Sequence, residues 1–116
     1  MIFITNSFPL ATLSAWRITD ADSETNISIR PVADPVAWLA EAEQRHGTAV
    51  SSVGHADTAE IFSAELNRDV AFNRVSIEIG ENTEVLVGQY FGPRLPEGTT
   101  ELPVGAKICW VVVTIQ

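Results

Sequence analysis

Cysteine is nearly absent from this sequence, which has one, Cys109, in 116 residues. A single cysteine cannot form an intrachain disulfide bond, and no CxxC motif or His–Cys cluster suggests a metal site. Cys109 lies in an apolar, strand-like run, so we interpret it as a small buried hydrophobic residue rather than a nucleophile. The sequence therefore predicts neither a disulfide scaffold nor a metal centre.

Basic residues are also scarce. Lys and Arg number 7 against 15 Asp and Glu, giving a formal net charge of -8 at pH 7. We therefore expect no non-specific binding to long nucleic acids, whose backbone repels such a chain. A small anionic ligand is not excluded, and with so few cations the position of each arginine carries information.

Long apolar runs are missing as well. No stretch approaches the roughly 20 residues that a membrane span needs, so we expect no membrane partner. Residues 1–6 lack the basic segment and small-residue cleavage site of a secretion signal. Apolar residues make up 46% of the chain and charged residues 19%, which is typical of a folded protein. The length suits one domain, residues 1–116, rather than two.

The hydrophobic pattern predicts interleaved strands and helices without a regular βαβ rhythm. Strands are expected at residues 1–6, 27–30, 72–79, 84–91 and 107–116, with a brief extended segment at 48–53. Helices are expected at about 35–46 and 57–67, and residues 15–26 are expected to form a solvated loop or hairpin. The predicted fold is α/β of the α+β type, with a mixed sheet of about five strands and helices packed on it.

The first predicted helix has clear boundary signals. Asp34 precedes Pro35, which is an N-cap followed by proline at the first helical position, and Gly47 follows the last turn. His46 lies near the C-terminal end, where we interpret it as a favourable partner of the helix dipole. This helix is expected to have a packing role.

Gly54 and His55 stand immediately before the second predicted helix. Asp57 is a plausible N-cap, with Glu60 at the capping-box spacing. The first turn of a helix has unpartnered N–H groups and the positive end of the dipole, so it attracts anions. His55 would lie where a phosphate binds, and Gly54 would let the backbone pass close to a ligand. Judged on this stretch alone, an ordinary polar histidine at a helix entrance is the simpler interpretation.

The strand predicted at 84–91 is almost entirely apolar, which is typical of a central strand covered on both faces. Inside the apolar run that follows Glu84, the one strongly polar side chain is Gln89. A hairpin formed by 72–79 and 84–91 would place Arg74 opposite Gln89 on the same face. Such a pair would either contact a ligand or form an internal hydrogen bond, and both interpretations stay open.

Residues 92–105 hold three glycines and three prolines, which predicts a stiff connection with two similar turns, at 95–98 and 102–105. A structureless connection of this length in a small domain is usually functional or disordered. Arg94 is therefore a credible fixed contact for an anion.

Several blocks of the sequence together resemble one known family. The blocks are residues 54–59 (GHADTA), 73–75 (NRV), 89–98 (QYFGPRLPEG) and 102–106 (LPVGA), with 6–8 (NSF) near the N-terminus. In this order they are similar to the viral ring nucleases that act as type III anti-CRISPR proteins and to their bacterial and prophage relatives. The resemblance covers about residues 53–116. Residues 15–50 carry no signature. Asn67, which we expect to end the second helix because asparagine tolerates a left-handed C-cap, stands where relatives often have glycine.

The resemblance implies a cytoplasmic homodimer, in the host cytoplasm if a virus encodes it. It implies binding of cyclic tetra-adenylate, the second messenger of type III CRISPR immunity, and cleavage to linear di-adenylate without metal or cofactor. It further implies the roles of the site residues: His55 as the catalytic histidine, Arg94 and Glu97 at the reactive phosphate, and Asn6, Arg74 and Gln89 on the ligand, with Gly54 beside it.

The chemistry of an RNA phosphodiester agrees with these roles. The adjacent 2′-OH is its own nucleophile, so the protein must align that hydroxyl, stabilise phosphorane charge and protonate the leaving 5′-oxygen. His55 as general acid would contribute roughly 10²–10⁴-fold. Arg94 and the helix-start N–H groups would supply electrostatic stabilisation. Glu97 could orient either Arg94 or His55.

Two other classes of function remain open at the level of sequence. One is a non-catalytic sponge that binds cyclic oligoadenylate and only sequesters it. The other is a structural or interaction protein of a virus or prophage, in which the polar residues are merely a solvated face.

Overall fold

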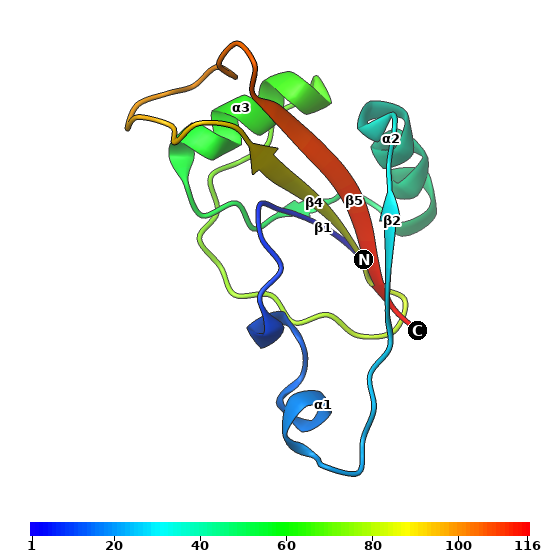
Figure 1. Cartoon of the computed structure of the whole chain (residues 1–116). Helices are drawn as coiled ribbons and strands as arrows, with labels where there is room; N and C mark the ends of the chain where they lie inside the picture. Colours follow the sequence, from blue (N-terminus) through cyan, green and yellow to red (C-terminus); the bar gives the residue numbers. More distant parts are fainter.

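The computed structural model describes residues 1–116 and contains a five-stranded mixed sheet with the strand order β2-β5-β4-β1-β3 (Figure 1). The strands are β1 (Ile2–Thr5), β2 (Ile27–Pro31), β3 (Val50–Ser51), β4 (Glu84–Phe91) and β5 (Lys107–Ile115). The helices are α1 (Ala15–Thr19), α2 (Pro35–His46) and α3 (Ala56–Leu66), with a 3₁₀ turn η1 at Leu10–Thr12. Strand β1 pairs in parallel with β3 and β4, whereas β5 is antiparallel to β4 and β2. The predicted fold class is confirmed.

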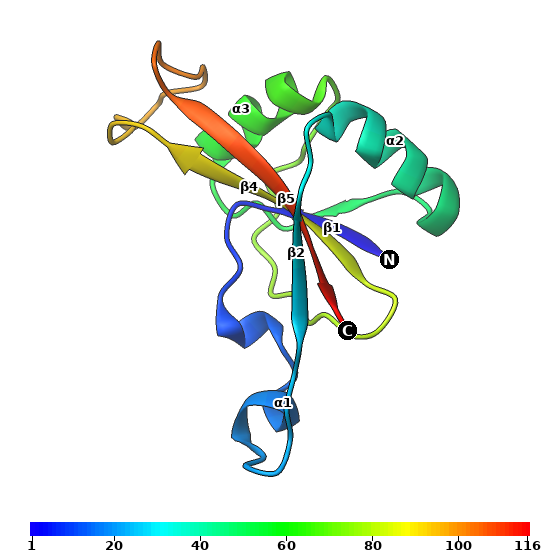
Figure 2. The same ribbon diagram turned by 45° about the vertical axis from the view of Figure 1, so that its right-hand side comes forward.

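Helices α2 and α3 lie together on one face of the sheet (Figure 2). The core of this face holds Leu39 from α2 and Phe62 from α3 against Ile4 and Leu86 of the strands. The opposite face has a smaller core, in which Leu13 and Ile79 are among the residues that cover the strands. The middle of strand β4, Val85 to Gly88, is therefore buried on both faces, as its apolar sequence predicts, whereas its last residues, Gln89 to Phe91, are partly or fully exposed.

The predicted strand at residues 72–79 does not form, and the predicted hairpin with β4 is wrong. This segment runs outside the sheet and makes a single bridge, between Leu13 and Ile79. The reason is that β1 and β5 already occupy both edges of β4. The alternating apolar residues Ile77 and Ile79 still pack on the second core, because an extended cover segment has the same period as a strand.

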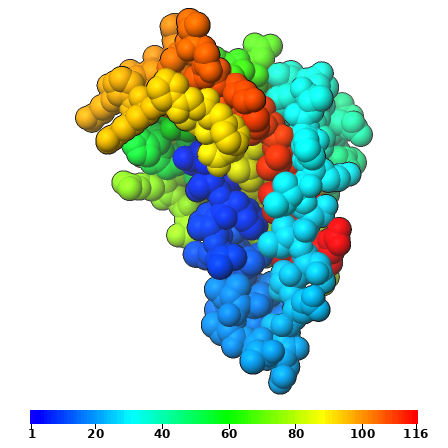
Figure 3. Space-filling model, in the orientation of Figure 1, coloured from blue at the N-terminus to red at the C-terminus, as the bar shows by residue number.

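The sequence predicts a solvated loop or hairpin for all of residues 15–26. The first five of these residues instead form the helix α1. The guanidinium of Arg17 lies 4.5 Å from the ring centroid of Trp16, a cation–π contact that favours this local fold. In Figure 3 this part of the chain forms one tip of the molecule, and the loop at 92–105 projects near the other end.

Helix α2 forms at the predicted place. The side chain of Asp34 accepts a hydrogen bond from the N–H of Ala37 (3.1 Å), and Gly47 has a φ of 87°. His46 Nε2 lies 2.9 Å from Glu84 Oε1, so this histidine ties the end of α2 to the start of β4. None of the helices combines the length and apolar character needed to cross a membrane.

Glu43 is the second polar anchor of α2. Its carboxylate accepts hydrogen bonds from Arg68 and from the N–H of Ala49, the latter at 2.7 Å. Burial raises the pKa of Glu43, but these hydrogen bonds and the charge of Arg68 outweigh that effect, so its pKa is lowered. Glu43 thus joins α2 both to the segment before β3 and to the segment after α3.

Gly88 of β4 lies against the aromatic pair Phe62 and Trp110, whose ring centroids are 4.8 Å apart. A Cβ at Gly88 would lie 2.7 Å from Phe62 Cζ and 2.8 Å from Trp110 Cζ3. We expect Gly88→Ala to lower the free energy of unfolding by about 1–3 kcal/mol, as overpacking does in well-packed cores. Urea denaturation measures the effect. Gly80→Ala is the control, because nothing lies within 4 Å of its Cβ position; equal stability of the two variants would contradict the prediction.

Candidate active site

The carboxyl ends of the parallel strands meet at one edge of the sheet. Asn6 follows β1, the segment of Gly54 and His55 follows β3, and Gln89 lies near the end of β4. Strands β1 and β4 run side by side, with Thr5 paired to Val87. In open α/β sheets, ligands bind in the crevice outside the carboxyl ends of the strands. This edge is therefore the natural position for a binding site.

His55 is the N-cap residue of α3. Its backbone is extended (φ -134°, ψ 124°), its side chain makes no capping hydrogen bond, and the residue is exposed. Without a side-chain cap, the first-turn N–H groups are free to bind an anion. The predicted N-cap at Asp57 is wrong, because the carboxylate of Asp57 accepts a hydrogen bond from the N–H of Gly98 (2.7 Å) instead.

His55, Arg94 and Glu97 line one pocket of about 370 Å³. Asp57, Thr58 and Leu95 also contribute to its wall. Both Arg94 and Glu97 are exposed, and neither takes part in an ion pair, because the three ion pairs of the structure involve other residues. The side chain of Glu97 also makes no hydrogen bond to Arg94 or His55. The polar groups of all three side chains therefore line the pocket without a partner in the protein.

Asn6 and Gln89 line an adjoining pocket of about 240 Å³. Thr58 and Leu95 line both pockets, so the two pockets are neighbours. The other lining residues of the second pocket are largely apolar: Ile61, Phe62, Gly88, Tyr90 and Ile108. The Gln89 Nε2 donates to the carbonyl of Tyr90 at 3.1 Å, which leaves its Oε1 available. The second pocket is thus an apolar surface edged by two carboxamides.

Arg74 is not paired with Gln89, because its segment forms no strand beside β4. Gln89 instead pairs with Cys109 of β5, and that cysteine is half-buried rather than fully buried as predicted. The Cγ of Arg74 instead lies 3.5 Å from where a Cβ on Gly54 would be. Arg74 and Gly54 are therefore neighbours at the same edge of the sheet as His55.

Asn73, which the sequence reasoning missed, holds Arg74 in this position. Its N–H donates to the carbonyl of Val53 (2.9 Å), and its Nδ2 donates to the carbonyl of Ser51 (2.7 Å). In the sequence, Asn73 is marked only by its place in the NRV block. The fold shows that its side chain forms a hydrogen bond with the β3 segment.

The structure has the two similar turns that the sequence predicts in the loop at residues 92–105, each one residue later than expected, at 96–99 and 103–106. The N–H of Thr99 donates to the carbonyl of Pro96, and that of Ala106 to the carbonyl of Pro103. Gly98 and Gly105 occupy the third position of these turns, with φ of 87° and 85°. At the start of the loop, the Tyr90 hydroxyl donates to the carbonyl of Pro93 (2.5 Å) and fixes the chain next to Arg94.

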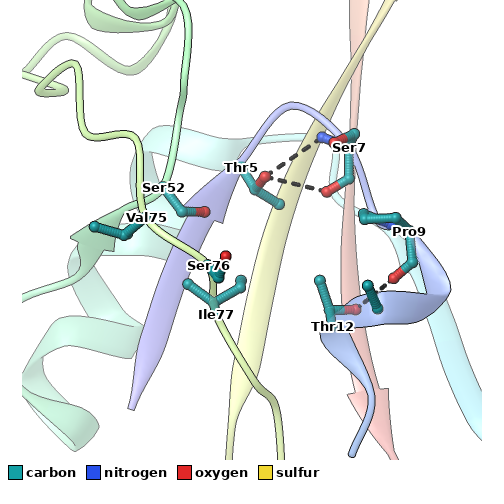
Figure 4. A pocket seen from close by; sticks show the side chains of 9 residues that line it. Thr5, Ser7, Pro9, Thr12, Ser52, Val75, Ser76 and Ile77 are labelled. Carbon is teal, nitrogen blue, oxygen red and sulfur yellow. Dashed lines mark hydrogen bonds between the residues drawn. The ribbon is translucent and has the colours of Figure 1, made fainter. Parts of the chain in front are cut away.

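A further pocket, of about 220 Å³, lies beside the end of β1 and is lined by hydroxyl groups (Figure 4). The Thr5 Oγ1 donates to the carbonyl of Ser7 and accepts from its N–H, and the Thr12 Oγ1 donates to the carbonyl of Pro9. These hydroxyl groups form hydrogen bonds within local turns of the backbone. No residue that the sequence predicts for the site lines this pocket. We assign the candidate site to the other two pockets.

Comparison with known protein families matches residues 2–103 to the STIV B116-like family, and the chain belongs to this family. Among solved structures it is similar to B116 of Sulfolobus turreted icosahedral virus, with a TM-score of 0.72 and 24% identity over 97% of each chain. That likeness shows a shared fold with a viral protein. A comparison with curated proteins gives no match.

Proposed function

We propose that this protein is a metal-independent ring nuclease that cleaves cyclic tetra-adenylate to linear di-adenylate and so switches off type III CRISPR signalling. The observation that carries the proposal is the meeting of His55, Arg94 and Glu97 on one pocket at the uncapped start of α3. Family membership and the fold shared with a viral protein support the virus-related part of this proposal at a coarser level.

The three residues match what a phosphodiester needs when its own 2′-OH is the nucleophile. The 2′-OH loses its proton to solvent water as its oxygen attacks phosphorus, and the bond to the 5′-oxygen breaks, which leaves a 2′,3′-cyclic phosphate on one end. His55 donates a proton to the departing 5′-oxygen, which becomes a 5′-hydroxyl. Arg94 and the free N–H groups of α3 stabilise the extra negative charge of the phosphorane. Glu97 completes the polar wall of the pocket, where it can orient one of these groups once the ligand is bound.

The adjoining pocket suits an adenine base. Its apolar lining offers a surface on which a base can pack, and the carboxamides of Asn6 and Gln89 stand at the rim. A carboxamide can donate to N7 and accept from the N6 amino group of adenine at the same time. Arg74, next to Gly54, adds a positive charge for a neighbouring phosphate.

A homodimer is part of the proposal. A ring of four identical nucleotides has an internal symmetry that a two-fold dimer can match with two identical half-sites. Each half-site then needs only a few cations, which agrees with a chain whose net charge is -8. The acidic surface would also disfavour longer RNA, so a generic single-stranded RNA is expected to compete poorly with the cyclic ligand.

The test is incubation of the purified protein with cyclic tetra-adenylate in excess EDTA. We expect linear di-adenylate to accumulate at the same rate with and without EDTA, because no step of the proposed chemistry uses a metal. Separation of the products by liquid chromatography with mass detection measures the rate.

Other outcomes of this assay would select a different function. Tight binding with full recovery of the intact ring would show a sponge rather than a nuclease. If the ligand stays intact and nucleotides do not shift the melting temperature, the protein has a structural or interaction role. Loss of cleavage in EDTA that added Mg²⁺ restores would overturn the metal-independent mechanism.

A further inference from the structure

Asp57 lies in the first turn of α3, yet its carboxylate contacts the loop at 92–105. Its Oδ2 accepts a hydrogen bond from the N–H of Gly98 (2.7 Å), a residue 41 positions further along the chain. An aspartate in the first turn of a helix is usually explained by the positive end of the dipole. The dipole requires no distant partner, so it does not account for this contact.

This hydrogen bond is the only one that joins residues 92–105 to a part of the chain outside the loop and its flanking strands. The other hydrogen bonds of the loop close its two turns or link Pro93 to Tyr90 of β4. Apolar contacts of Leu95 and Leu102 with the core supply the remaining attachment. Asp57 is thus the single polar anchor of the loop on α3.

The anchor is made at the turn that carries Glu97. The N–H of Gly98 is available because the turn is closed by the N–H of Thr99 and the carbonyl of Pro96. The second turn has the same geometry, with Gly105 in the equivalent position, but no carboxylate accepts from its N–H. Of two similar turns, the anchored one is the turn beside His55.

We propose that Asp57 is a positioning residue that holds the first half of the loop so that Arg94 and Glu97 stay beside His55. This inference rests on the proposed ring nuclease function. Asp57→Ala is expected to lower kcat roughly ten- to hundredfold, since small misplacements of catalytic groups have effects of that size. KM is expected to stay within about threefold, because Asn6 and Gln89 of the adjoining pocket belong to the ends of β1 and β4, outside the anchored loop.

Two matched variants separate anchoring from other effects. Asp57→Asn keeps a side-chain oxygen that can accept from Gly98 but removes the charge, so it is expected to recover most of the kcat. Glu60→Gln changes an exposed acid on the same helix and is expected to behave as the wild type. If Asp57→Asn is as slow as Asp57→Ala, or if Asp57→Ala cleaves at the wild-type rate, the positioning role is overturned.

Amide hydrogen exchange tests the anchor without any activity. The N–H of Gly98 is expected to exchange at least about tenfold faster in Asp57→Ala than in the wild type, because its acceptor is gone. Unchanged exchange would overturn the inference. A wild-type protein that does not cleave the ring would instead refute the proposed function, and the exchange experiment would still decide whether Asp57 holds the loop.

Discussion

Replacing His55 by alanine is expected to slow cleavage of cyclic tetra-adenylate roughly 10²–10⁴-fold, the usual contribution of a general acid. The physical reason is that the leaving 5′-oxygen would depart without a proton donor. The fold is expected to tolerate the change, because His55 is exposed and its side chain makes no capping hydrogen bond. Single-turnover cleavage measures the chemical step, and a thermal melt verifies that the variant is folded.

The chain offers a matched control in its only other histidine. His46 is bound to Glu84 at the end of α2, and it does not line the candidate site. His46→Ala is expected to lose some thermal stability and to keep its rate of cleavage. A His55→Ala variant that cleaves as fast as the wild type would remove His55 from the mechanism, whatever the behaviour of His46→Ala.

Replacing Arg94 by alanine is expected to lower kcat roughly 10²–10³-fold, the usual loss when one group that stabilises transition-state charge is removed. Arg94 makes no ion pair in the protein, so its guanidinium is free to meet the phosphate. Arg94→Lys keeps the charge but loses the planar fork, and it is expected to fall between the wild type and alanine. Steady-state kinetics at saturating ligand measure these differences.

Arg30→Ala is the control for a general loss of positive charge. Arg30 is exposed near the end of β2 and lines a pocket away from the candidate site. We expect its kcat to equal that of the wild type. Equal losses in Arg30→Ala and Arg94→Ala would mean that overall charge, and not a contact at the phosphate, is responsible.

The parts of the fold that follow from local signals could be predicted from the sequence. Asp34, Pro35 and Gly47 define α2 because a cap and a stop act on the residues next to them. The same is true of Asn67, whose φ of 52° ends α3 as a left-handed cap. Such signals do not depend on distant parts of the chain.

The partners of each strand could not be predicted in this way. The alternation at 72–79 fits a hairpin with β4 just as well as it fits a cover segment. What decides is that Ile2–Thr5, some eighty positions earlier, occupies the edge of β4 in parallel. The competition between β1 and residues 72–79 for that edge leaves no local trace in the sequence.

The candidate site shows the same division. Two separate sequence blocks indicated His55 on the one hand and Arg94 with Glu97 on the other, and the structure brings these three residues to one pocket. The Arg74–Gln89 contact was wrong because it depended on the hairpin. Asp57 was interpreted as a cap, because sequence spacing cannot show that a carboxylate prefers an N–H on a distant loop over its own helix.

The parallel pairing of β1 with β4 also has a consequence for synthesis of the protein. Until residues 84–87 are available, β1 can pair only with the two residues of β3, which is too short a partner to hold it. Pairing β1 with β4 closes a loop of about eighty residues, and the entropic cost of that closure is offset only once the contacts between β1 and β4 can form. Asn6 and Gln89 therefore come together only after most of the chain has left the ribosome, and a chain that ends before β4 lacks the pocket that they share.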